Sequence, residues 1–183
     1  NDYNTLVGSG TEADPYIIND ADTLYMIIAS GGTHYGVPQY YKLGCNIDLE
    51  GKQWLDTDIF ENTTYNVVYY NYQPFAGTLD GDGYTISGLY GYEIGGYLGK
   101  EGDSEYDLGF FNTIGADAYV KNLKISNSYF NGLNQGSVGC IAGHFYGTLT
   151  NCQVLDSVVK TRISSAGALV GSASDATVEN CET

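Results

Sequence analysis

The sequence has little proline and few positive charges. It carries 3 prolines in 183 residues, and its 7 Lys and Arg residues stand against 22 Asp and Glu residues, which gives a formal net charge of -15. Such an acidic surface repels phosphate backbones and anionic membrane surfaces, so nucleic acid is not an expected partner. Cations, neutral glycans and basic proteins fit this charge. The 25 glycines beside so few prolines predict many tight turns rather than a proline-rich linker.

Long apolar runs are absent as well. No stretch approaches the roughly 20 apolar residues that a membrane-spanning helix needs, so membrane insertion is not expected. Residues 1–4 lack the positive charge that begins a signal peptide. If the chain is secreted, either its signal peptide has been removed or it is a piece of a longer polypeptide. The sequence stops at Thr183 inside a repeat, which favours the second alternative. We therefore expect further repeats or domains of the same polypeptide as neighbours.

The sequence also lacks a cysteine or histidine motif with the spacing of metal ligands. The four cysteines form no C-x-x-C pair, and the two histidines, His34 and His144, lie far apart in the sequence. These residues predict no zinc site, no other metal centre and no cofactor. Neither histidine has a recognisable partner, so both are predicted to be ordinary surface or turn residues.

What the sequence does contain is an internal repeat in its C-terminal half. One set of asparagines recurs every 29 residues, and one set of glycines recurs every 28 to 30 residues. The asparagines are Asn122, Asn151 and Asn180, and the glycines are Gly109, Gly139 and Gly167. Each repeat is predicted to hold two short apolar strands that are separated by turns.

A period near 29 residues without helical periodicity predicts stacked strand-and-turn coils, because leucine-rich and helical repeats need a helix in each unit. Stacking in register places equivalent residues about 4.8 Å apart on parallel strands. We therefore predict an all-β fold, a right-handed parallel β-helix (β-solenoid), with the asparagines in left-handed corners. Leu123, Cys152 and Cys181 should share one inward column, with both cysteines buried as free thiols.

The N-terminal half predicts the start of the same solenoid. Residues 41–49 alternate apolar and polar and predict one half-buried strand, and residues 75–79 and 84–89 predict two more. Residues 21–29 predict a short amphipathic helix that begins after Asn19 or Asp20 and covers the open end of the first coil.

The whole chain is thus expected to be one solenoid domain in three parts. These are an N-terminal cap and first coil at 1–50, coils with inserted loops at 51–107, and regular repeats at 108–183.

Two tyrosine-rich stretches, 56–73 and 90–107, interrupt the repeat and are predicted to be inserted loops. Insertions in repeat proteins often lie on the binding face, and tyrosine offers a ring and a hydroxyl that suit contact with a glycan or a protein. Tyrosine is also a good strand residue, which is the alternative interpretation. The predicted ligand-binding residues are Tyr69, Tyr70, Tyr72, Tyr90, Tyr92 and Tyr97.

The second stretch also carries four carboxylates in alternation. They are Glu101, Asp103, Glu105 and Asp107. Calcium takes six to eight oxygen ligands, but the spacing does not match the calcium loop of an EF-hand. A solvated acidic loop is the favoured interpretation, with calcium binding as the alternative.

These repeats resemble the GLUG-repeat family of bacterial surface and exported proteins. The named motif is similar to Gly-Cys-Ile-Ala-Gly at 139–143 and Gly-Ala-Leu-Val-Gly at 167–171, and segments 8–18, 46–49 and 75–86 resemble the start of such regions. The resemblance implies a pectin-lyase-like β-helix that lies outside the cell or on its surface. Similar repeats accompany adhesins and streptococcal immunoglobulin-cleaving metallopeptidases, outside the catalytic domain. The family has no shared catalytic residues, and this sequence has no H-E-x-x-H motif.

Two functional hypotheses follow. The first is a non-catalytic binding, adhesion or spacer module. The alternative is a carbohydrate-active β-helix enzyme, a polysaccharide lyase or glycoside hydrolase that uses Asp80 and Asp82, because a glycosidase needs two carboxylates across a groove. These two aspartates lie in an Asp-Gly-Asp-Gly turn, where Asp is favoured for its backbone geometry. Since Arg162 is the sole arginine of an acidic chain, a polyuronate substrate fits poorly, and no enzymatic activity is expected.

Overall fold

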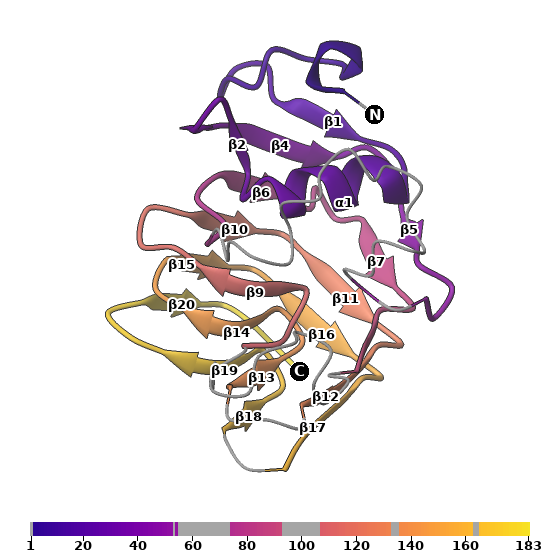
Figure 1. The fold of residues 1–183 in the computed structure, drawn as a ribbon, viewed down its shortest axis with the longest axis vertical. Coiled ribbons are helices and arrows are strands. Elements are labelled where there is room, and N and C mark those ends of the chain that lie inside the picture. The colour runs from indigo at the N-terminus through magenta and orange to yellow at the C-terminus, as the bar shows by residue number, and fades with distance from the viewer. Residues whose placement is uncertain (1, 53, 55–73, 93–106, 133–135, 163–164) are drawn as a thin grey trace, which may run out of the picture.

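The computed structural model describes residues 2–52, 54, 74–92, 107–132, 136–162 and 165–183 (Figure 1). Short strands dominate these residues, together with one α-helix, α1 (Ala21–Ala29), and one 3-10 helix, η1 (Tyr3–Thr5). The strand pairs are parallel except for an antiparallel hairpin of β2 (Thr33–His34) and β3 (Val37–Pro38). The predicted all-β class with parallel sheets is confirmed.

Four parallel sheets and one parallel strand pair make up the structure. The first sheet contains β1 (Tyr16–Ile18), β4 (Tyr40–Leu43), β6 (Thr78–Asp80), β10 (Tyr119–Lys121), β15 (Thr148–Thr150) and β20 (Thr177–Glu179). The second contains β5 (Ile47–Asp48), β7 (Thr85–Ser87), β11 (Lys124–Ser126) and β16 (Gln153–Leu155). The third contains β8 (Tyr90–Tyr92), β12 (Tyr129–Gly132) and β17 (Val158–Thr161). The fourth contains β9 (Phe111–Ile114), β14 (Ala142–Phe145) and β19 (Val170–Ala173), and the pair is β13 (Val138–Gly139) with β18 (Ala166–Gly167).

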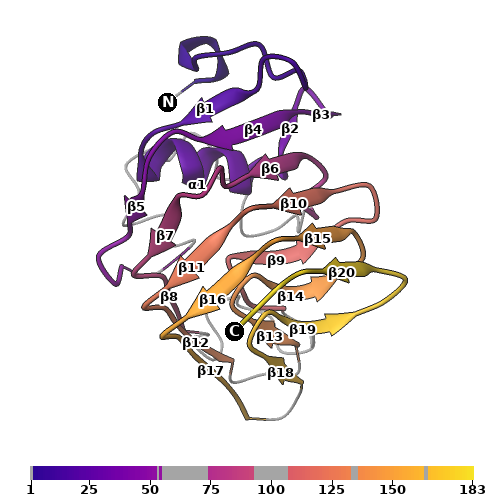
Figure 2. The ribbon, with the colours of Figure 1, turned by 180° about the vertical axis from the view of Figure 1, so that it is seen from behind.

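The chain visits these sheets in a fixed order. From β9 it runs through β10, β11 and β12, and it returns through β13 to β14, which pairs with β9. We call one such passage a rung. Figures 1 and 2 show the rungs stacked along the long axis, with the N-terminus at one end. The two complete rungs among the described residues, β9–β13 and β14–β18, therefore hold five short strands each, not the two that the repeat predicted.

The repeated asparagines form one of these corners. Asn122, Asn151 and Asn180 have φ values of 54°, 52° and 52°, in the left-handed region that Asn tolerates better than most residues. The prediction of left-handed asparagine corners is confirmed. A second corner, between the second and third sheets, has the same conformation at Asn127 (φ 47°) and Asp156 (φ 46°), and these two residues are also 29 positions apart.

In-register pairing brings the predicted inward positions into columns. Val120 pairs with Leu149, which pairs with Val178, so their neighbours Leu123, Cys152 and Cys181 also occupy one column. Leu123 and Cys152 are fully buried, whereas Cys181 is only partly buried against the core. The prediction that both cysteines are buried is wrong for Cys181, because no described strand follows it in the stack. All four cysteines are free.

The repeated glycines are required by close backbone contacts. A Cβ atom on Gly139 would lie 2.3 Å from the carbonyl oxygen of Ala142, and one on Gly167 would lie 2.0 Å from that of Val170. Real Cβ atoms do not approach backbone oxygens this closely, so any other residue forces the backbone apart. Gly109 lies at the same place, where a Cβ would meet the carbonyl oxygen of Gly139 at 2.6 Å.

The single strand predicted at 41–49 is two strands in the structure. The chain turns between β4 and β5, so Tyr41 belongs to the first sheet and Ile47 to the second. A Cβ on Gly44, between them, would lie 2.1 Å from the Asn19 side-chain oxygen. Tyr41 and Ile47 still face the core, because the corner preserves the inward direction of the alternation.

The predicted helix is present but its amphipathic character is not. The Asp20 side chain accepts a hydrogen bond of 2.7 Å from the backbone N–H of Thr23 and caps α1. All six residues from Thr23 to Ile28 are buried, because α1 lies within the core, where Trp54 packs edge-on against Tyr25. Figures 1 and 2 show α1 beside β4 and β6, with η1 and β1 beyond it at the end of the stack. In the part of the chain that is described, no helix has the length and apolar character to cross a membrane.

Candidate binding surface

The structure places only two of the six predicted ligand-binding tyrosines. Tyr69, Tyr70, Tyr72 and Tyr97 lie outside the described residues. Tyr90 and Tyr92 belong to β8, which pairs in parallel with β12. The prediction of an inserted loop from residue 90 onward is therefore wrong for its first three residues, whose tyrosines serve as strand residues.

Tyr90 is one ring of an aromatic column on the outer side of the third sheet. Its ring lies 5.4 Å from the ring of Tyr129, the residue with which it pairs, and the two ring planes differ by 11°. The ammonium of Lys160 lies 5.6 Å from the centre of the Tyr129 ring. The Tyr129 ring thus contacts two other side chains, and its hydroxyl accepts a hydrogen bond of 3.2 Å from Nδ2 of Asn131. This column offers hydrogen-bonding groups rather than a bare ring face.

The first sheet carries a column of alternating charge on its outer side. Lys42, Asp80 and Lys121 occupy successive positions in register. Lys121 Nζ lies 3.9 Å from Asp80 Oδ2, and Lys42 Nζ lies 3.1 Å from Asp82 Oδ2. The hydrogen bond from Lys42 to Asp82 raises the pKa of the lysine above its usual value. Exposed pairs of this kind contribute little to stability, but they place opposite charges along one line of the surface.

Asp80 and Asp82, the carboxylates of the enzyme hypothesis, form a turn. Asp80 Oδ1 accepts a hydrogen bond of 2.8 Å from the backbone N–H of Asp82 and one of 2.9 Å from Nδ2 of Asn122. Asp82 has a φ of 51°. These contacts match the predicted structural role in an Asx turn. The two carboxylates lie two residues apart in that turn and pair with lysines, instead of facing each other across a groove.

His144 has partners that the sequence did not reveal. Its Nδ1 lies 3.8 Å from Asp107 Oδ2, its Nε2 lies 3.5 Å from Ser174 Oγ, and its ring stacks on Tyr146 at 4.4 Å. Asp107 also accepts a hydrogen bond of 3.0 Å from the backbone N–H of Ser137. The sequence did not reveal the two polar partners, because Asp107 lies 37 residues before His144 and Ser174 lies 30 residues after it.

The order Asp, His, Ser has the composition of a nucleophilic triad. However, both spacings around His144 exceed the roughly 2.6–3.2 Å at which a base takes a proton from a nucleophile. The contacts of Asp107 join it to the wall of neighbouring rungs, so the cluster acts as a structural tie. Of the acidic run, Glu101, Asp103 and Glu105 lie outside the described residues. Among the residues that are described, no three His, Cys, Asp or Glu side chains come together as metal ligands.

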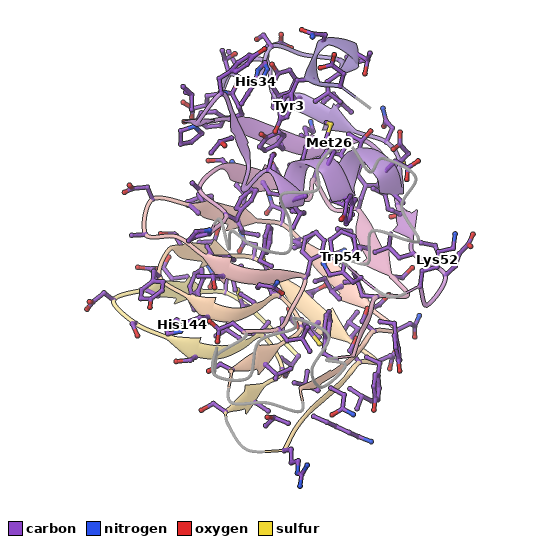
Figure 3. The ribbon with its side chains drawn as sticks, in the orientation of Figure 1. Tyr3, Met26, His34, Lys52, Trp54 and His144 are labelled. Carbon is purple, nitrogen blue, oxygen red and sulfur yellow. The ribbon has the colours of Figure 1, made fainter. Side chains whose placement is uncertain are left out.

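His34 also has partners, at the N-terminal end of the stack. Its ring lies parallel to that of Tyr3, with centres 4.3 Å apart and planes 5° apart, and its other neighbour is Tyr35 at 4.5 Å and 27°. Figure 3 shows Tyr3 and His34 side by side at this end, far from His144 on the flank. His34 is half-exposed beside the hairpin turn, as a surface or turn residue should be, but its aromatic partners were not predicted. Only Gly36 points to this turn in the sequence, because a two-residue hairpin favours Asn, Asp or Gly at its first position, where Tyr35 stands.

Comparisons with known proteins give two similar sequences. The chain is 30% identical over 151 residues to Halomucin from Haloquadratum walsbyi, an alignment of 82% of this chain and 2% of Halomucin. It is 27% identical over 150 residues to a protein of Evansella cellulosilytica whose name describes a Gly-rich membrane protein, an alignment of 80% of this chain and 15% of that protein. The chain thus spans a small part of either relative. No protein-family model and no solved structure matches it.

Proposed function

We propose that this chain is a non-catalytic module of a surface or secreted protein, which binds a glycan or protein or spaces other domains apart. In this proposal its rungs form a right-handed parallel β-solenoid of the GLUG-repeat kind. The observation that carries the proposal is the register of the rungs, in which equivalent residues lie in columns along the molecule. A stack of this kind displays a long, regular outer surface and can be extended by adding rungs.

The alternative is a polysaccharide lyase or glycoside hydrolase that uses Asp80 and Asp82. Catalysis by two carboxylates needs a pair that faces a bound sugar from opposite sides, about 5 to 9 Å apart. Asp80 is instead engaged by Asn122 and by the backbone of Asp82, and Asp82 by Lys42. These contacts support a structural role for both aspartates and so favour the binding module.

The two similar proteins support a location at the cell surface or membrane. One is named as a mucin and the other as a membrane protein, and this chain aligns with only 2% and 15% of their lengths. A module that forms a small part of a long polypeptide fits a role in spacing or display, in which the neighbours of the module are further repeats or domains.

An activity screen separates the two functions. The chain is incubated with a panel of neutral and acidic polysaccharides, and new reducing ends and unsaturated uronates are measured. We expect no product above that of the Asp80→Asn, Asp82→Asn double variant, which keeps side-chain oxygens that can accept the turn hydrogen bonds. Product formation by the natural chain that the double variant loses would establish the enzyme and overturn the module.

A further inference from the structure

The β2–β3 hairpin has an unusual residue at its tip. Its two turn residues, Tyr35 and Gly36, have φ values of 50° and 78°. Two-residue hairpins with both values positive favour Asn, Asp or Gly at the first position, because those residues tolerate the left-handed conformation. A tyrosine there is strained, and nothing in the turn requires an aromatic side chain. Strain at an exposed tip is a reason to look for a function.

The Tyr35 ring is both held and exposed. One side stacks on His34, which lies parallel to Tyr3, and the Tyr3 hydroxyl is within 2.8 Å of both the Tyr41 hydroxyl and Ser30 Oγ. A row of rings thus runs from the core to the hairpin tip. Tyr35 is nevertheless 92% exposed, the largest exposure among the described large apolar residues. Holding the ring in place in advance lowers the entropy lost when a ligand stacks on it.

The surroundings of the tip leave room for a ligand. A Cβ atom added to Gly36 would have no neighbour within 4 Å, and Val37, beside it, is 58% exposed. Figures 1 and 2 show the hairpin projecting from the side of the N-terminal end. Tyr129 differs, because its ring contacts both Tyr90 and Lys160. Among the described tyrosines, Tyr35 is by far the most exposed, since Tyr146, Tyr40 and Tyr90 are only 36–40% exposed.

We propose that Tyr35 is a stacking platform for a neutral pyranose sugar; this proposal rests on the proposed function and specifies its ligand and site. The C–H groups on one face of a pyranose carry partial positive charge and fit the negative face of an aromatic ring. The formal charge of -15 disfavours acidic sugars. A quaternary ammonium ligand is best held by a cage of several aromatic rings. A protein partner would need an anchor seated in a packed patch rather than a projecting ring.

The test compares the chain with three variants. Methyl β-galactoside, methyl β-glucoside, methyl α-mannoside and N-acetylglucosamine are the probes, and saturation-transfer NMR and titration of the Tyr35 ring signals measure binding. Tyr35→Asn removes the ring and suits the left-handed turn, Tyr35→Phe keeps the ring, and Tyr146→Ala removes a 40% exposed tyrosine elsewhere. Thermal unfolding checks that each variant folds.

We expect at least one probe to bind and to shift the Tyr35 signals. Tyr35→Asn should weaken that binding by about tenfold or more, Tyr35→Phe by less than about threefold, and Tyr146→Ala not at all. Tyr35→Asn should also be at least as stable as the natural chain, because Asn relieves the strain. Undiminished binding by Tyr35→Asn would place the sugar elsewhere, which overturns this inference but not the proposed function. No binding of any probe by the natural chain would overturn the assignment of a neutral pyranose to Tyr35.

Discussion

The carboxylate of Asp80 accepts a hydrogen bond of 2.9 Å from Nδ2 of Asn122, a corner residue of the next described rung. The bond joins two rungs that are 42 residues apart in the sequence. Asn122 thereby combines two roles, since it tolerates the left-handed corner and its amide ties one rung to its neighbour. Asn151 occupies the equivalent corner one rung later; its backbone N–H donates to the Glu179 carbonyl, but its side-chain amide makes no hydrogen bond to any described residue.

This difference gives a matched pair of substitutions. Asn151→Ala should lower the free energy of unfolding by about 1 kcal/mol, the cost of placing Ala in the left-handed region. Asn122→Ala should lower it by about 2 kcal/mol, because the hydrogen bond to Asp80 is lost as well. Chemical denaturation of both variants measures the difference. Equal losses for the two would mean that the bond between Asn122 and Asp80 contributes nothing to stability.

The buried thiols predict how stability depends on pH. Burial raises the pKa of Cys140 and of Cys152 to about 12 from an ordinary 9.0. Between about pH 9 and pH 12, both thiols therefore stay protonated in the folded chain but are deprotonated in the unfolded chain. The stability that comes from the protonated thiols is fully present below about pH 9. Above it, the free energy of unfolding falls by about 1.4 kcal/mol per thiol for each pH unit, up to about pH 12.

Urea denaturation at pH 8 and pH 10 tests this dependence. The natural chain should lose about 3 kcal/mol of its free energy of unfolding over this interval from the two thiols together. Cys152→Ala should lose about half as much, although it starts from a lower stability. In the native chain at pH 8, alkylation of Cys152 should be slower than that of an ordinary thiol by roughly a thousandfold. Rapid alkylation of Cys152 in the native chain, or a disulfide-linked Cys152–Cys181 peptide, would contradict the assignment of Cys152 as a buried free thiol.

The last described rung should be the least protected from hydrogen exchange. Val178 is 42% exposed although it continues the column of Val120 and Leu149, which are fully buried. Strands with one unpaired edge open more readily than strands paired on both sides. Amides at 178–181 should therefore exchange faster than those at 123–125. Equal protection of the two segments would show that some other contact closes this end of the chain.

The sequence predicted those parts of the fold that depend on local backbone chemistry. The 29-residue spacing of Asn122 and Asn151 identified left-handed corners because few residue types suit that conformation. The columns of Leu123 and Cys152 followed from the same spacing. β8 (Tyr90–Tyr92) was predicted to be a loop, because its three residues are too few to show a strand pattern beside the acidic, tyrosine-rich stretch that follows.

The surface features depended on contacts between distant segments, so sequence patterns did not reveal them. His34 looked isolated because Tyr3, its stacking partner, lies 31 positions earlier. His144 looked isolated because Asp107 and Ser174 belong to neighbouring rungs. Tyr35 was missed because its significance comes from its exposure and backbone conformation rather than from its residue type.

The most direct test of the stacked rungs is a measurement of methyl–methyl nuclear Overhauser effects in a chain with labelled Leu and Val methyl groups. In the stack, Leu149 lies between Val120 and Val178, about 4.8 Å from each along the column. Leu149 should show cross-peaks to both valines, whereas Val120 and Val178, at about twice that distance, should show none to each other. A cross-peak between the two valines, or the absence of either Leu149 cross-peak, would contradict the stacking order on which the proposed solenoid rests.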